Sequence, residues 1–105
     1  LEFRVPGADA NPYLSIAGIL ASVRKGIEDA KEPQGSTGGD AAEQSISRYS
    51  MDLESATKIF AESEFAKNEF GADFVSHYVT HLEHEYKKFG VAVTDWEVQR
   101  YRDSI

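Results

Sequence analysis

Apolar and polar residues alternate with the period of an α-helix in the first third of the chain. Large apolar side chains recur there at alternating spacings of three and four residues, which gives one stripe along a helix. The stripe consists of Tyr13, Ile16, Leu20, Val23 and Ile27. Asn11 can cap this helix, and Pro12 suits its first position because the missing N–H would be unpaired there anyway. The pattern predicts a helix over residues 11–31, which Pro33 ends.

The same periodicity predicts a helical bundle over residues 51–105. Asp52 can cap a helix that runs to about Glu62, because its carboxylate accepts hydrogen bonds from free N–H groups of the first turn. A shorter helix follows from Ser63 and is closed by Gly71.

The longest helix of this bundle is expected over Ala72–Phe89. Its apolar face is formed by Val75, Tyr78, Val79, Leu82, Tyr86 and Phe89. Gly90 ends it, since glycine tolerates the left-handed conformation of a helix exit. Thr94 and Glu97 have the spacing of a capping box, which should fix the start of a last helix.

The segments on either side of the first helix lack helical periodicity. Residues 1–10 begin with a strand-like alternation and continue into a turn that contains Pro6 and Gly7. Residues 32–50 are rich in glycine and polar residues, which predicts a flexible loop. The expected fold class is therefore mainly α, with about four or five helices after a short N-terminal strand.

Composition and charge narrow the possible partners. The chain has 105 residues, of which 41% are hydrophobic and 28% charged, as expected for one small globular domain. Its net charge of -7 opposes binding to nucleic acid or to an anionic membrane. It contains no cysteine and no apolar run of about 20 residues, so disulfides and a membrane span are not expected. The expected location is the cytoplasm.

Three histidines of the longest helix form a first candidate for chemistry. His77, His81 and His84 lie at spacings of four and three residues and therefore share one face. That face is well away from the apolar one, so it should point into water. Because a metal site needs buried groups that support its ligands, a solvated face is favoured over a Zn²⁺ or Ni²⁺ site.

An acidic and a basic residue near the N-terminus form a second candidate. Glu2 and Arg4 are two residues apart and so lie on the same side of a strand. A carboxylate can ligate a hard cation, and a guanidinium can hold an anionic oxygen. Such pairs are also common as plain surface features of edge strands, so the pair alone favours a structural role.

The context of this pair resembles the glutamine synthetase family. The resemblance rests on Glu2-Phe3-Arg4, the turn after it, and Ala10-Asn11-Pro12-Tyr13-Leu14. His84-Glu85-Tyr86 and Val93-Thr94-Asp95-Trp96-Glu97 are similar to the closing helices of that family. The resemblance implies that the chain is the C-terminal helical part of an α+β catalytic domain.

Function and cofactors enter as expectations from this resemblance. Members of the family use ATP and Mg²⁺ or Mn²⁺ to join the γ-carboxylate of glutamate to ammonia or an amine through γ-glutamyl phosphate. The resemblance assigns Glu2 to metal binding and Arg4 to the glutamate or its γ-phosphoryl group. It also implies a homo-oligomer, and it places the remaining active-site residues in the rest of the catalytic domain. The 105 residues alone are therefore expected to be inactive.

Two other classes of function fit the same residues. A helical interaction or structural module without catalytic activity is consistent with the size of the chain and its capped helices. A family relative that has kept the fold and lost its activity is consistent as well, since fold alone does not determine function. Retention of Glu2 and Arg4 argues mildly for an active ligase.

Overall fold

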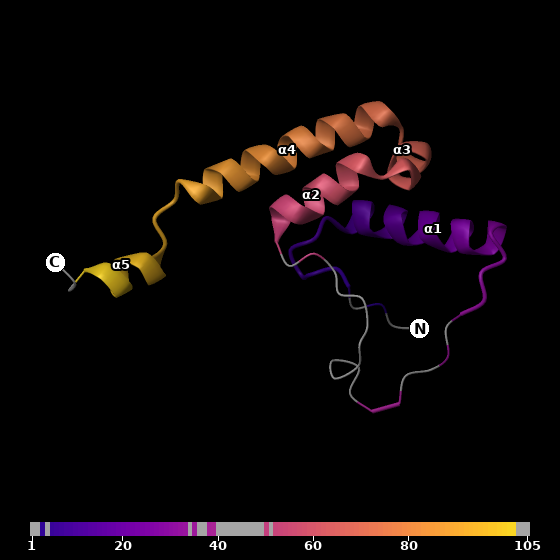
Figure 1. The fold of residues 1–105 in the computed structure, drawn as a ribbon, viewed down its shortest axis with the longest axis horizontal. Coiled ribbons are helices and arrows are strands. Elements are labelled where there is room, and N and C mark those ends of the chain that lie inside the picture. The colour runs from indigo at the N-terminus through magenta and orange to yellow at the C-terminus, as the bar shows by residue number, and fades with distance from the viewer. Residues whose placement is uncertain are drawn as a thin grey trace. The chain divides into compact units, whose positions relative to one another are not determined.

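The computed structural model describes Phe3, residues 5–33, Gly35, residues 38–39, Ser50 and residues 52–102 (Figure 1). These fall into two units, which divide between Ile46 and Ser47 and are described separately. Five helices lie in the described residues: α1 (Pro12–Glu28), α2 (Leu53–Glu62), α3 (Glu64–Phe70), α4 (Ala72–Gly90) and α5 (Asp95–Tyr101). The predicted mainly α fold is confirmed.

Helix α1 starts where its cap predicts. The side chain of Asn11 accepts hydrogen bonds from the backbone N–H groups of Tyr13, at 3.0 Å, and Leu14, at 3.2 Å. Pro12 occupies the first helical position, where no hydrogen bond of its nitrogen is lost. The start of the helix therefore depends on two adjacent residues only.

The helix ends at Glu28, three residues before the predicted end at residue 31. Ala30 has a φ of 49°, in the left-handed region. The backbone N–H of Ala30 donates to the Ile27 carbonyl at 3.1 Å, and that of Lys31 donates to the Gly26 carbonyl at 3.0 Å. This pair of bonds is a Schellman motif, in which alanine occupies the position that glycine usually takes. The sequence signal is weak because alanine is ordinarily a helix former.

Replacing Ala30 by glycine is expected to stabilise this helix end. A left-handed alanine costs roughly 1–2 kcal/mol relative to glycine. Glycine loses more backbone entropy on folding than alanine does, and this loss offsets about half of that gain. Exchange of the Lys31 amide hydrogen should slow by about two- to fivefold, equivalent to roughly 0.5–1 kcal/mol. The matched control is Ala17→Gly in the interior of the same helix. This substitution should make amide hydrogen exchange in α1 faster, because glycine destabilises a helix interior. Faster exchange in Ala30→Gly would contradict the assignment.

Helices α2, α3 and α4 form the second unit's compact part. Asp52 caps α2 by accepting a hydrogen bond from the N–H of Ser55 at 2.7 Å, and Ser63 caps α3 by accepting from Ala66 at 3.1 Å. Gly71 separates α3 from α4 with a φ of 85°, which a residue with a side chain rarely adopts. The chain therefore turns back at α3, and α4 packs on both α2 and α3. Figure 1 shows α2 lying alongside α4.

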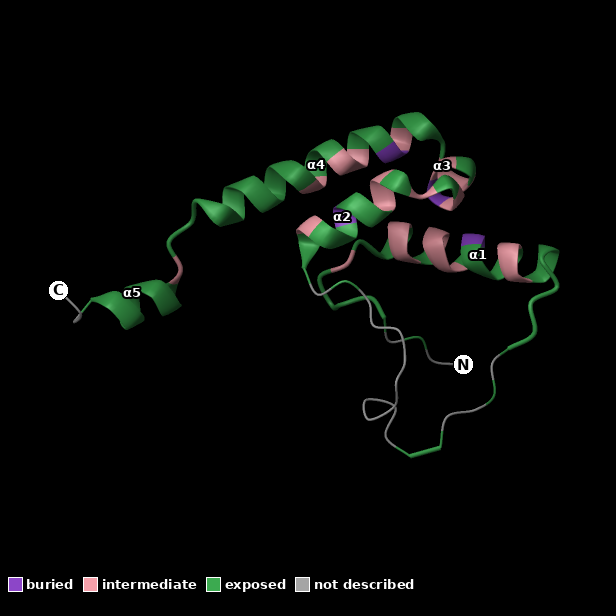
Figure 2. Ribbon diagram, viewed as in Figure 1, coloured by how far each residue is buried: buried purple, intermediate pink, exposed green. Residues whose placement is uncertain are grey.

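The core of this compact part is small. One residue each of α2, α3 and α4 is buried, namely Thr57, Ala66 and Val75 (Figure 2). Aromatic rings extend this core: Tyr78 lies 5.9 Å from Phe60 in an edge-on contact and 5.7 Å from Phe74 in a stacked one. These rings join α2 to α4 and add directional contacts to the burial of apolar surface.

The predicted apolar face of α4 is covered over only part of its length. Val75 is buried and Tyr78, Val79 and Leu82 are half-buried, but Tyr86 and Phe89 are exposed. Helix α2 has 10 residues against the 19 of α4, so it covers about half of the longer helix. The C-terminal end of α4 therefore extends beyond its neighbour.

Helix α5 begins with the predicted capping box. The Thr94 hydroxyl accepts a hydrogen bond from the N–H of Glu97 at 3.2 Å, and the Glu97 carboxylate accepts from the N–H of Thr94 at 2.8 Å. Trp96 and Tyr101 lie edge to face at 6.4 Å, and both are exposed. The local sequence thus fixes this helix without a covering partner within the described residues.

The predicted N-terminal strand is not seen. Phe3 and Val5, the described residues of that segment, belong to no strand. A strand needs a neighbour for its N–H and C=O groups, and the described part of the chain holds no other strand. Most of the predicted loop over residues 32–50 lies outside the described residues. No helix within the described ranges has the length and apolarity to cross a membrane.

Candidate functional site

The predicted site residues Glu2 and Arg4 lie outside the described residues. Their described neighbours Phe3 and Val5 are exposed. A turn then closes with the Ala10 N–H donating to the Gly7 carbonyl at 3.1 Å, and it leads directly into the capped start of α1. The position of Glu2 and Arg4 on the same side of a strand stays a prediction.

Gly7 leaves room for the side chain of Asp9 within this turn. A Cβ at that position would lie 2.6 Å from Oδ1 of Asp9, which is closer than atoms of this kind approach. A side chain at Gly7 would therefore force the Asp9 carboxylate to move. The segment that leads into α1 is held by the hydrogen bond between Ala10 and Gly7 and by the Asn11 cap.

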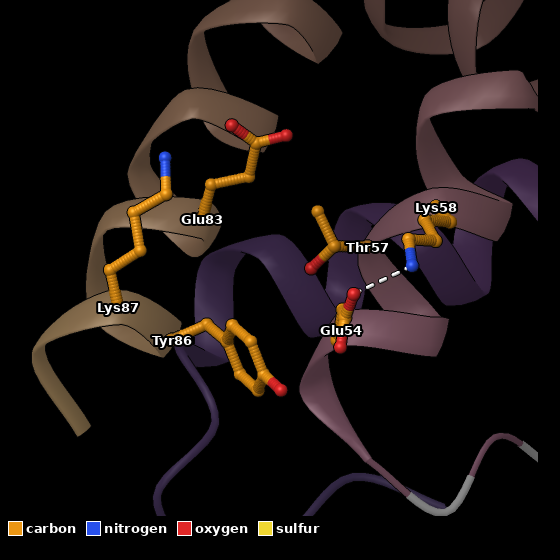
Figure 3. A pocket seen from close by; sticks show the side chains of 6 residues that line it. All are labelled: Glu54, Thr57, Lys58, Glu83, Tyr86 and Lys87. Carbon is orange, nitrogen blue, oxygen red and sulfur yellow. Dashed lines mark hydrogen bonds and ion pairs between the residues drawn. The ribbon is translucent and has the colours of Figure 1, made fainter. Parts of the chain in front are cut away.

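A groove lies between α2 and α4 in the compact part of the second unit. It has a volume of about 250 Å³. Its walls are formed by Glu54, Thr57 and Lys58 of α2 and by Glu83, Tyr86 and Lys87 of α4. Figure 3 shows the Tyr86 ring turned toward Glu54, whose carboxylate is joined to Lys58 at 2.6 Å. Both helices thus contribute charged side chains to the walls of the groove.

The charges in this groove stabilise one another. The hydrogen bond from Lys58, followed by that from Tyr86, lowers the pKa of the Glu54 carboxyl. The same Glu54 carboxylate raises the pKa of Lys58 and that of the Tyr86 hydroxyl. Each shift moves the pKa of the group further from neutral pH, so these three groups keep their ordinary protonation states there. The contacts among them favour a role in joining α2 to α4.

The histidines of α4 lie where the helical face predicts. His77, His81 and His84 are all exposed. The ring of His81 lies 6.1 Å from that of Tyr78, so it extends the aromatic row at the edge of the core. Within the described ranges, no group of three or more His, Asp or Glu residues is arranged to hold a metal ion.

Sequence reasoning missed the contact across the groove. The Glu54–Lys58 pair is readable, because a spacing of four residues places the two side chains on one helix face. The approach of Tyr86 is not, since it depends on how α2 and α4 pack. The sequence pattern places Tyr86 on the apolar face of α4, and its hydroxyl instead meets the charged edge of that face.

Comparison with known proteins identifies the family. Residues 1–101 match the glutamine synthetase catalytic domain. With 100% of the chain covered, it is 42% identical to the glutamate–isopropylamine ligase of a Pseudomonas species. It is 37% identical to the gamma-glutamylethanolamide synthetase of Streptomyces coelicolor, with 94% of the chain covered. It is 34% identical to type-1 glutamine synthetase 2 of Dictyostelium discoideum, with 99% of the chain covered.

The chain corresponds to only part of each of these relatives. It spans 24%, 21% and 21% of the length of these three relatives, respectively. No solved structure matches the chain. The family match nevertheless includes the N-terminal turn. It also includes helices α2, α3 and α4, which together form the α2–α4 hairpin. The chain therefore belongs to the glutamine synthetase family, with residues 1–101 corresponding to part of the catalytic domain.

Proposed function

We propose that this chain is part of an ATP-dependent ligase that joins the γ-carboxylate of glutamate to an amine. The observation that carries the proposal is the catalytic-domain match over residues 1–101. The two relatives at 42% and 37% identity are named for isopropylamine and for an ethanolamide, which favours an amine over ammonia as the acceptor. Ammonia is the second candidate, because a glutamine synthetase is 34% identical.

Arg4 has a direct role in the proposed reaction. The γ-carboxylate of glutamate takes the γ-phosphoryl group of ATP, and the amine then displaces phosphate and loses a proton. Negative charge develops on the phosphoryl oxygens during both steps. A guanidinium held close to these oxygens stabilises that charge and orients the group, as positioned cations do in phosphoryl transfer generally.

Glu2 is the proposed ligand of a divalent cation, Mg²⁺ or Mn²⁺. Such ions are bound through one or two carboxylates together with phosphate oxygens and water, so one carboxylate fits as part of a shared site. Its further ligands are proposed to lie in the rest of the catalytic domain. A bound cation would neutralise charge on the nucleotide and on the transferred group.

The 105-residue chain alone is proposed to be inactive. It covers about a quarter of the Pseudomonas ligase, and it offers one candidate metal ligand and one candidate guanidinium. Its proposed partners are the rest of the catalytic domain, glutamate, the amine and further copies of the whole protein in a homo-oligomer. We place the whole protein in the cytoplasm, where ATP and glutamate are available.

A chimera tests the proposal. In this chimera, residues 1–105 replace the matched 24% of the Pseudomonas glutamate–isopropylamine ligase. ADP release is measured with Mg²⁺, ATP and glutamate, and with isopropylamine, ethanolamine, putrescine or ammonium as acceptor. We expect release that requires glutamate and is fastest with an amine, while the 105-residue chain alone gives none. A folded chimera that releases no ADP with any acceptor would contradict the proposal.

A further inference from the structure

The α4 wall of the groove between α2 and α4 carries one acidic and one basic side chain. Glu83 and Lys87 lie about one helical turn apart on α4, and both line the groove. Neither side chain forms a hydrogen bond or an ion pair with another residue that the structure describes. Figure 3 shows the Lys87 side chain extended along α4 toward Glu83. A carboxylate and an ammonium group are therefore available on one wall.

The charged groups of the opposite wall already have partners. The Glu54 carboxylate accepts hydrogen bonds from Lys58, at 2.6 Å, and from Tyr86. Thr57 is buried, and its hydroxyl donates to the Leu53 carbonyl at 2.7 Å. The methyl group of Thr57 and the ring of Tyr86 remain as uncharged surface of the groove. The groove thus combines one available charge of each sign with a small apolar surface.

A ligand that matches this wall carries both charges a short distance apart. Side chains one helical turn apart have Cβ atoms about 5–6 Å from one another. In a free α-amino acid the ammonium and the carboxylate are attached to the same carbon, so one molecule can reach both Glu83 and Lys87. A ligand with a single charge leaves one of the two unmatched. The volume of about 250 Å³ also suits a ligand smaller than the drug-sized molecules that fill roughly 300–1,000 Å³.

We propose that this groove is a binding site for a free α-amino acid with a small apolar side chain. The α-ammonium group of the ligand donates to Glu83, and its α-carboxylate accepts from Lys87. Its side chain contacts the ring of Tyr86 and the methyl group of Thr57. Binding displaces at most a weak contact, because an exposed pair such as Glu83 and Lys87 contributes little to stability. The inference does not rest on the proposed function, since it uses residues of α2 and α4 alone.

Titration of the 105-residue chain with L-valine tests the site. The backbone amide resonances of Thr57 and Tyr86 should shift and saturate with a Kd of about 1–10 mM, because exposed ion pairs give weak binding. Two analogues of valine each lack one charge: 3-methylbutanoate lacks the ammonium group, and isobutylamine lacks the carboxylate. Neither should give a saturable shift at the same concentrations. Absence of a saturable shift with L-valine, or an equal shift with either analogue, would overturn the inference.

Matched substitutions on α4 test the two charged residues. Glu83→Gln and Lys87→Gln each remove one ion pair with the ligand and should weaken valine binding about two- to fivefold. Glu85→Gln and Lys88→Gln remove the same charges at positions that do not line the groove, where the two residues pair with one another at 3.7 Å. These controls should leave the Kd unchanged. All four positions are exposed, so circular dichroism should show retained helix content. If the controls weaken binding as much as the groove variants do, the inference is wrong.

The chimera defined above tests whether the groove is open in a whole protein. L-valine should raise the Tm of the chimera, because a ligand that binds the folded state stabilises it. Glu83→Gln should reduce this rise, and Glu85→Gln should not. If the rise in Tm is absent or does not depend on Glu83, another part of the protein covers the groove and the inference is wrong. This measurement requires no turnover, so it remains decisive if the chimera releases no ADP.

Discussion

Replacing Arg4 by alanine in the chimera is expected to reduce kcat for ADP release by roughly 10²–10³-fold, the range seen when one donor to a developing negative charge is removed. The guanidinium is proposed to contact the transferring γ-phosphoryl group, where its charge is needed most in the transition state. Steady-state kinetics with varied glutamate distinguishes this role from simple binding. Loss of a contact made only in the transition state lowers kcat. Loss of a contact made equally in the ground state raises KM and leaves kcat unchanged.

Two further substitutions define the role of Arg4. Arg4→Lys keeps the charge but loses the planar pair of donors, so it should restore activity only in part. Arg24→Ala is the matched control, because Arg24 is an exposed arginine of α1 that forms an ion pair with Glu28. The control should change kcat less than about twofold, since exposed ion pairs contribute little. If Arg4→Ala behaves like this control, Arg4 does not participate in the reaction.

The starts of the helices could be predicted because their determinants are local. Asn11, Asp52 and the pair Thr94 and Glu97 each satisfy N–H groups within three residues of themselves. Such a bond depends on the nearby sequence and hardly on the rest of the fold. The end of α1 is harder to predict, because Ala30 takes a conformation that its own preference opposes.

Properties that depend on a neighbour could not be predicted from the same sequence. The stripe of α1 and the face of α4 have similar patterns, yet Leu20 is exposed and Val75 is buried. The pattern predicts that a face is apolar. Which element covers that face depends on tertiary packing, which the pattern does not predict. The same holds for the N-terminal strand at Phe3 and Val5, which needs a second strand to form.

The candidate site divides in the same way. Glu2 and Arg4 are assigned from a sequence resemblance, and the family match supports the resemblance without placing either side chain. The contact between Glu54 and Tyr86 has no sequence signal, because the two residues are 32 positions apart and meet only after α2 and α4 pack. Motifs thus indicate chemistry, and packing determines which groups meet.

Replacing Val75 by aspartate is expected to unfold the α2–α4 hairpin. Val75 is 3% exposed and is one of three buried residues that α2, α3 and α4 contribute to their common core. A buried charge without a partner costs roughly 3–5 kcal/mol. A unit of this size has a total stability of only a few kcal/mol, so most molecules should lose the hairpin. Circular dichroism of the 105-residue chain should show a large loss of helix at about 25 °C.

The matched control uses the same substitution at an exposed valine. Val93 is 76% exposed and precedes α5, so Val93→Asp should change the free energy of unfolding by less than about 0.5 kcal/mol. If Val75→Asp retains the helix content of the unsubstituted chain, Val75 does not lie in the core, and the packing of α4 on α2 and α3 is wrong. If Val93→Asp also unfolds the hairpin, the stability of the chain depends on its C-terminal segment, and the small core between α2, α3 and α4 does not suffice to hold it.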